Sequence, residues 1–245
     1  MTGTVRRAVR ISLTLFIIGS VLAPQTSFAA KRTYKPPFLF QNAQQFCESR
    51  SAYGTSVCSG MTNAVARTGS MSVEARITSP NAGMGPGRGN AFSIGLIGGV
   101  ASTDSARSIP ITVTIFVRSA IASTPMPHSV VATGSSALAG LQMYFVHTFC
   151  YRECTAIKDV SVVTAGTLDS VSSVKGKTYT VNLTLRHRNA RRLPAGTVAF
   201  GIAGYSFASV GRSTRKPIPV EEFPLPDVGS SRAKLDVLIK SISVG

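Results

Sequence analysis

The most regular pattern in the sequence is an alternation of apolar and polar residues in Thr178–Arg186. Its apolar residues occupy every second position: Tyr179, Val181, Leu183 and Leu185. The segment Gly196–Phe207 repeats this period with Val198, Phe200 and Ile202. A period of two is typical of a β-strand with one face in the core and the other in water. We therefore predict a hairpin from Gly176 to Phe207, with a short basic tip between its two arms.

Similar patterns predict strands along most of the chain. These segments are Met71–Thr78, Ala91–Val100, Ile111–Arg118, Leu141–Phe149, Ile157–Thr164, Leu168–Val174 and Leu235–Val244. Four prolines make Pro217–Pro226 an edge strand or a crossing loop. Only Gln41–Arg50, with Phe40, Ala43 and Cys47 on one side, predicts a short helix. About ten short strands with little helix predict an all-β fold, an antiparallel β-sandwich that is jelly-roll-like.

The N-terminal residues have the pattern of a signal peptide. Arg6, Arg7 and Arg10 precede the apolar run Ile11–Ala23, and small residues around Ala29 suit cleavage at that point. The apolar run is shorter than the roughly 20 residues that span a bilayer. We predict that residues 1–29 form a cleaved signal peptide and that the protein is secreted, periplasmic or bound at the cell surface. An uncleaved N-terminal anchor is the alternative.

The mature chain is predicted to have two parts. Residues 30–62 form an N-terminal leader, which is basic and then rich in proline, and a disulfide-tied cap. Residues 63–245 form the β-sandwich domain, and their number is sufficient for one sizeable core. Two smaller sandwiches remain the alternative.

The four cysteines predict disulfide bonds, because an exported chain meets an oxidising environment. Of the three possible connectivities, the sequence favours the local one, Cys47–Cys58 with Cys150–Cys154. Residues four apart in a continuous strand are about 13 Å apart, so a Cys150–Cys154 bond requires a hairpin tip. A redox-active pair or a zinc site is the alternative, but neither Cys-x-x-Cys nor His-x₃-His occurs in the sequence.

The chain is strongly basic, with 26 basic and 10 acidic residues and a formal net charge of +16. Removing the three arginines of the signal peptide leaves +13 on the mature chain. Such an imbalance attracts anionic polymers and surfaces. Because the chain is predicted to be exported, we expect lipopolysaccharide, teichoic acid or extracellular nucleic acid as the partner.

The sequence carries no recognisable catalytic pattern. It has no Gly-x-Ser-x-Gly elbow, and its histidines are isolated from one another: His128, His147 and His187. A long-range carboxylate pair, such as Asp159 with Asp236, remains open for glycoside hydrolysis. The glycine-rich run Gly83–Gly89 precedes a predicted strand rather than a helix, so we interpret it as a loop rather than a phosphate cradle. We expect neither an enzyme nor a bound cofactor or metal.

Seven basic residues in two loops are the candidate anion-binding residues: Arg186, Arg188, Arg191, Arg192, Arg212, Arg215 and Lys216. Guanidinium groups present paired donors to phosphate and carboxylate. The sequence thus predicts an exported, non-catalytic protein that binds or coats an anionic cell-surface polymer or surface. The alternatives are a self-associating structural subunit of an envelope or extracellular assembly, a jelly-roll hydrolase and a sugar-binding module. The loops could also serve solubility alone.

Overall fold

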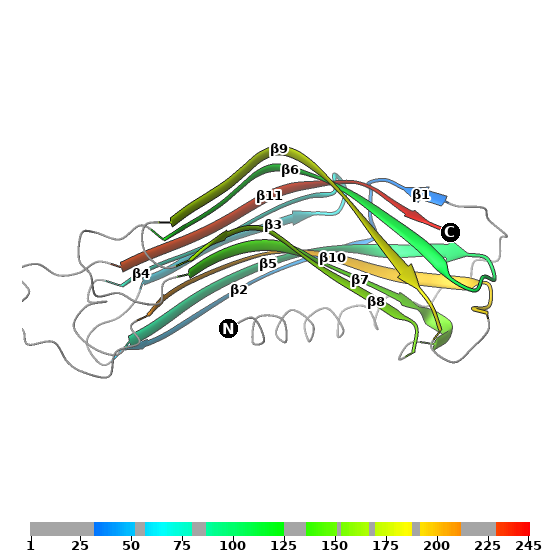
Figure 1. The fold of residues 1–245 in the computed structure, drawn as a ribbon, viewed down its shortest axis with the longest axis horizontal. Coiled ribbons are helices and arrows are strands. Elements are labelled where there is room, and N and C mark those ends of the chain that lie inside the picture. Colours follow the sequence, from blue (N-terminus) through cyan, green and yellow to red (C-terminus); the bar gives the residue numbers. More distant parts are fainter. Residues whose placement is uncertain are drawn as a thin grey trace, which may run out of the picture.

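The computed structural model describes residues 32–51, 57–79, 87–124, 136–150, 153–166, 170–187, 192–211 and 229–245. Their strands form two antiparallel sheets that pack against each other (Figure 1). The six-stranded sheet contains β1 (Arg32–Tyr34), β3 (Val57–Val65), β4 (Ser70–Ser79), β6 (Ile109–Thr124), β9 (Ser170–Leu185) and β11 (Gly229–Val244). The five-stranded sheet contains β2 (Phe40–Ser51), β5 (Gly87–Thr103), β7 (Ser136–His147), β8 (Thr155–Ala165) and β10 (Gly196–Gly211). The predicted all-β sandwich is confirmed.

The strand order places the two C-terminal strands at the centre of the sheets. The six-stranded sheet runs β3-β4-β11-β6-β9, with β1 on the end of β11, and the five-stranded sheet runs β2-β5-β10-β7-β8. Therefore β11 joins β4 to β6, and β10 joins β5 to β7. Several strands have 16 or 17 residues, so they are longer than the short strands that the sequence predicts.

The main core lies between the sheets and follows the predicted alternation. On β4, Met71, Val73, Ala75 and Ile77 are at most 1% exposed, while the residues between them reach solvent. The inner residues of β6 are equally buried, and Phe145 of β7 packs on Phe200 of β10 with ring centroids 5.9 Å apart. Burial of these side chains is the dominant stabilising contribution to such a fold.

The hairpin predicted from Gly176 to Phe207 is wrong. Both arms are strands, but β9 pairs with β6 in one sheet, whereas β10 pairs with β5 and β7 in the other. The chain between them crosses from sheet to sheet, and Leu193 is fixed to Ala106 by two backbone hydrogen bonds of 2.7 and 3.0 Å. Alternation shows which face of a strand is buried, but it does not show in which sheet the strand lies.

The short helix predicted for Gln41–Arg50 is also wrong, because β2 covers this segment and pairs with β5. The residues predicted as a separate cap provide edge strands to both sheets. The disulfide Cys47–Cys58 joins β2 to β3, with Cα atoms 6.0 Å apart, and so links one sheet to the other. The predicted disulfide is confirmed, although it closes the sandwich rather than a separate cap.

The second predicted disulfide, Cys150–Cys154, is also confirmed, and it lies at the predicted hairpin tip between β7 and β8. A single 3-10 turn, Thr148–Cys150, starts the tip. The amides of Glu153 and Cys154 both donate to the Cys150 carbonyl at 2.9 Å. His147 donates its amide to the Cys154 carbonyl at 3.1 Å, so backbone bonds as well as the disulfide define the turn.

The six-stranded sheet bends near its middle, where β6 and β9 change direction (Figure 1). On β9, Gly176 has a φ of 67° and lies opposite Arg118 of β6. Next to them, the pairing of β6 with β11 shifts register between Asp236 and Val237. Bulges increase the local twist of a strand, and three adjacent strands share this position, so the irregularity crosses the sheet.

Candidate anion-binding surfaces

The basic tip predicted between Arg186 and Arg192 follows β9 at one end of the sandwich. Arg186 and Arg192 are exposed, and Arg192 Nη2 donates to the Ser105 carbonyl at 3.3 Å. The neighbouring Leu193 is fully buried and anchors the return of the chain into the fold. Arg188 and Arg191 lie outside the described residues.

The described attachment points of the two predicted basic loops lie far apart. One loop enters β10 at Gly196, and the other leaves it at Gly211, so their attachment points lie at opposite ends of a 16-residue strand. At about 3.3 Å per residue, roughly 50 Å separates these points. Arg212, Arg215 and Lys216 themselves lie outside the described residues, as does the predicted edge segment Pro217–Pro226.

A basic surface that the sequence does not predict lies on the outer face of the six-stranded sheet, from the Gly229 end of β11 to Lys240, just past the bend. We call it the basic sheet face, and its six cations are Arg76, Arg118, Lys175, Arg232, Lys234 and Lys240. They come from four adjacent strands, β4, β11, β6 and β9. For example, Arg76 pairs with Arg232, and Ser119 pairs with both Asp236 and Lys175.

Two acids on the same face neutralise part of this charge. Arg232 Nε lies 2.8 Å from Glu74 Oε1, and Arg118 Nη1 lies 3.7 Å from Asp236 Oδ1. The ammonium of Lys240 lies 4.8 Å from the centroid of the Phe116 ring, which holds it by a cation–π contact. Six cations against two acids leave a net excess of four positive charges on this part of the described surface.

Past Lys240, the outer face of the same sheet carries hydroxyl and amide groups. Thr112 pairs with Asn182 on one side and with Ser243 on the other, and Thr114 pairs with Thr180. The Thr112 hydroxyl donates to Asn182 Oδ1 at 3.0 Å. Five of the six cations of the basic sheet face therefore lie at the bend or on its Gly229 side, and Lys240 lies just past it.

Acids partly compensate the basic tip as well. Glu153 Oε2 lies 2.9 Å from His187 Nε2, which follows β9, and Asp104 lies in the loop that Arg192 contacts. Nearby, His147 is fully buried at the end of β7, and burial lowers the pKa of its imidazole, which a hydrogen bond with the Pro194 backbone opposes. His147 is therefore a neutral, buried side chain at one end of the core, and it does not act as an anion-binding cation at neutral pH.

The carboxylate pair Asp159 and Asp236, left open by the sequence, does not form. Asp159 lies on β8 opposite Gln142, whose amide donates to its Oδ1 at 2.6 Å, on the outer face of the five-stranded sheet. Asp236 lies on the outer face of the six-stranded sheet beside Arg118. Two carboxylates on opposite outer faces of a sandwich cannot act on one glycosidic bond.

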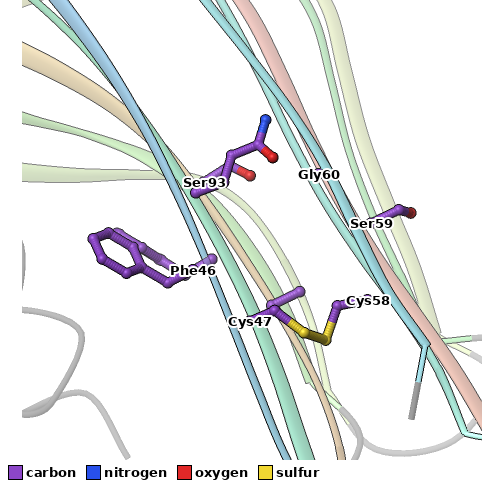
Figure 2. A pocket seen from close by; sticks show the side chains of 9 residues that line it. Phe46, Cys47, Cys58, Ser59, Gly60 and Ser93 are labelled. Atoms are coloured by element: carbon purple, nitrogen blue, oxygen red, sulfur yellow. A yellow bond between two sulfur atoms is a disulfide. The ribbon is translucent and has the colours of Figure 1, made fainter.

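A pocket of about 240 Å³ opens beside the disulfide that links the sheets (Figure 2). Phe46, Ser59, Gly60 and Ser93 line it together with that disulfide. The Ser93 hydroxyl donates to the Glu74 carbonyl at 2.6 Å. Since the lining holds no carboxylate, imidazole or amine, this pocket offers no side chain for general acid–base catalysis.

Two disulfides indicate that the protein matures in an oxidising environment. The described residues contain no helix with the length and apolarity needed to cross a membrane. The predicted signal peptide, residues 1–29, lies outside the described residues. In comparisons with known proteins, the sequence matches no protein family and no curated protein.

Proposed function

We propose that this is an exported, non-catalytic β-sandwich protein that binds an anionic cell-surface polymer or surface. The observation that carries the proposal is the basic sheet face, where six cations and two acids lie on four adjacent strands. The arginine-rich segments that the sequence predicts at the two ends of β10 add further positive charge to the chain. Lipopolysaccharide, teichoic acid and extracellular nucleic acid are the partners of matching chemistry.

The arrangement suits a polymer better than a single small anion. Neighbouring strands are about 4.8 Å apart, so the cations form a broad surface rather than a closed pocket. A repeating polyanion can contact several of them at once and release the counterions condensed along it. Each contact is weak alone, because exposed charges are screened by water and salt.

The test compares two triple variants of equal net charge. Arg76→Ser, Lys234→Ser and Lys240→Ser together remove half of the cations of the basic sheet face. The control removes three exposed cations elsewhere, namely Arg67→Ser, Arg107→Ser and Lys158→Ser. Binding to lipopolysaccharide, teichoic acid and DNA is measured at several salt concentrations.

We expect the sheet-face variant to bind more weakly, with a plot of log affinity against log salt that is flatter by about 2 units, as for three lost phosphate contacts. The control is expected to bind nearly as the wild type. Equal losses in the two variants would show that net charge alone drives binding, and no loss in either would refute the proposal.

A structural subunit is the second candidate function, and the strand order supports it. Strands β4-β11-β6-β9 face β5-β10-β7-β8, so the chain alternates between sheets in a way that supports the jelly-roll part of the predicted fold. Jelly rolls are frequent in capsid and lectin domains, where copies associate through sheet faces and edges. Sedimentation at rising protein concentration tests this candidate, and assembly that persists at high salt would favour it over polyanion binding.

A further inference from the structure

The edge strand of the five-stranded sheet, β2, has a sequence that is nearly palindromic. Its first seven residues are Phe-Gln-Asn-Ala-Gln-Gln-Phe, centred on Ala43. Positions equidistant from Ala43 carry the same residue or, at Asn42 and Gln44, the same amide group. In the described part of the chain, β2 pairs with β5 on one side only, so its other side is an open edge (Figure 1).

This open edge is suited to pairing with another strand. The side chains of Gln41, Ala43 and Gln45 are exposed along it, and the Ala43 amide donates to the side chain of the preceding residue, Asn42 Oδ1, at 2.7 Å. Edge strands that avoid pairing carry charges or prolines. The segment Leu39–Cys47 carries neither, so β2 lacks this protection.

The edges on the other side of the sandwich are protected. Lys158 lies on β8, and Lys175 and Lys177 of β9 flank Gly176, which has a φ of 67°. Lysines and local irregularities of this kind oppose the addition of a strand. The fourth edge, β3, is uncharged, but it has nine residues, contains Gly60 and has no palindromic sequence. The open edge of β2 is therefore the one best suited to a symmetric contact.

A row of aromatic side chains also ends at this edge. Phe207 of β10 lies opposite Phe92 of β5, and Phe92 lies opposite Phe46 of β2. The rings of Phe46 and Phe92 have centroids 6.1 Å apart. Phe46 is 54% exposed, so the row crosses three strands and leaves its last ring half in water.

We propose that two copies of the chain associate by antiparallel pairing of β2 with β2, about a two-fold axis at Ala43. In this register Ala43 lies opposite Ala43 of the second copy, and Gln41 lies opposite Gln45. Phe40 lies opposite Phe46, and opposed residues of an antiparallel pair project from the same face. Phe40 of the second copy therefore continues the aromatic row beyond Phe46, and the two five-stranded sheets join into one.

The occupant of the edge is a second copy because the sequence is symmetric. A two-fold contact brings each residue to its counterpart, so a palindromic strand matches itself, whereas an unrelated strand would not require the symmetry. The predicted mature chain carries a charge of +13, so two copies repel each other unless they meet at an uncharged surface. The segment Leu39–Cys47 provides such a surface.

This inference goes beyond polyanion binding and does not depend on it, since the basic sheet face belongs to the other sheet. It gives the second candidate function, the structural subunit, one defined contact. A two-fold contact closes at two copies and does not by itself form a filament. Salt screens the repulsion between the copies, so salt should strengthen the dimer, whereas it should weaken polyanion binding.

The first test changes the charge at the two-fold axis and measures the mass of the mature chain by sedimentation at rising protein concentration. Ala43→Lys places two ammonium groups opposite each other and is expected to raise the Kd of the dimer roughly 10-fold or more. The control Val171→Lys adds the same charge at an exposed position of β9 and is expected to dimerise as the wild type. An equimolar mixture of Ala43→Lys and Ala43→Glu is expected to associate again, because residue 43 lies opposite itself. Circular dichroism checks that each variant is folded.

The second test fixes the register by cross-linking. The four native cysteines form two disulfides, so Ala43→Cys adds the one free thiol. Opposed residues have Cα atoms about 5.5 Å apart, which suits a disulfide, so mild oxidation is expected to give a covalent dimer. Gln45→Cys is the control, because its counterpart in the second copy lies roughly 13 Å away along the strand.

Three outcomes would overturn the proposal. The first is a wild-type chain that stays monomeric at every concentration and salt. The second is an effect of Ala43→Lys on association no larger than that of Val171→Lys. The third is equal cross-linking of Ala43→Cys and Gln45→Cys.

Discussion

The outer faces of the two sheets have opposite characters. On the six-stranded sheet, β4 and β6 alternate between buried and partly exposed residues, and most of the outer side chains are hydroxyls and charges. On the five-stranded sheet, nearly every residue of β7 and β10 is buried, whether its side chain points to the inner or to the outer face. A second apolar cluster occupies its outer face: Ile94, Leu96, Tyr144, Val146, Ala199, Ala203 and Tyr205.

The two sheets therefore differ in the chemistry of their outer faces. A strand with one wet face alternates in sequence, whereas a strand buried on both faces reads as a continuous apolar run. The six-stranded sheet therefore has a polar outer face that carries most of its charged residues. The five-stranded sheet is apolar on both faces, because glycine, alanine, aliphatic and aromatic residues fill its outer positions as well as its inner ones.

The test with the largest expected effect on stability places one negative charge on the outer face of each sheet. Ala203 is fully buried in the outer cluster, so Ala203→Asp would bury an unpaired carboxylate and is expected to cost 4 kcal/mol or more, on the order of the largest single-residue effects. Thr114→Asp, on the outer face of the other sheet, is expected to change the free energy of unfolding by less than about 1 kcal/mol. Urea unfolding measures both.

If Ala203→Asp does not fold, Ala203→Ser gives a milder version of the same test. A buried hydroxyl without a partner is expected to cost about 1–3 kcal/mol. Equal costs for the substitutions at residues 203 and 114 would show that both outer faces are wet, and the comparison of the two sheets would then be wrong.

The next test removes the covalent link between the sheets. Cys47–Cys58 closes a loop of sequence separation 11, and Cys150–Cys154 closes one of sequence separation 4. In the chain-entropy model these loops contribute about 2.8 and about 1.9 kcal/mol respectively. Replacing each pair with alanine and measuring urea unfolding should therefore show the larger loss for the link between sheets. The reverse order would indicate that β2 and β3 are held mainly by their neighbours.

A smaller effect on stability is expected from adding one methyl group to the apolar outer face of the five-stranded sheet. At Gly140 on β7, a Cβ atom would lie 2.6 Å from Tyr205 Oη and 2.7 Å from the Val160 carbonyl. Gly140→Ala is expected to cost about 1–3 kcal/mol through overpacking. At Gly166 the added atom meets nothing within 4 Å, so Gly166→Ala is expected to stay within about 0.5 kcal/mol of the wild type. Similar melting temperatures for the two variants would contradict close packing around Gly140.

The smallest effect on stability is expected at the basic tip. The triple variant Arg188→Ser, Arg191→Ser and Arg192→Ser changes the predicted basic tip, of which Arg192 is described and exposed, so the free energy of unfolding should move by less than about 0.5 kcal/mol. If the tip binds polyanions, its salt dependence should flatten by about 2 units. Wild-type binding at every salt concentration would restrict the proposed binding to the basic sheet face.

Local patterns in the sequence were sufficient to predict most strands and both disulfides. Alternation in Met71–Thr78 and Ile111–Arg118 reports directly which side chains are buried, and the four-residue spacing of Cys150 and Cys154 requires a turn. The same patterns could not assign strands to sheets, because β9 and β10 bury their apolar faces equally well against opposite partners. Edge strand β2 was mistaken for a helix because only a few of its residues need to be apolar.

The candidate sites depended on long-range pairing, so the sequence could not reveal them. The basic sheet face combines Arg76 with Arg232, more than 150 residues later, through the pairing of β4 with β11. Runs such as Arg186–Arg192 are conspicuous in the sequence, whereas single cations in alternating strands are not. His187 likewise reaches Glu153 only because the chain after β9 passes the tip of another hairpin.

The central position of β10 and β11 has a consequence for the order in which the chain folds. Both strands are synthesised after all the other described strands, yet β11 must insert between β4 and β6, and β10 between β5 and β7. Until they arrive, neither sheet is continuous, and such long-range pairings make folding slow. An emerging chain thus stays open almost to the end of its synthesis, which is the state that a protein needs if it is to be threaded across a membrane before it folds.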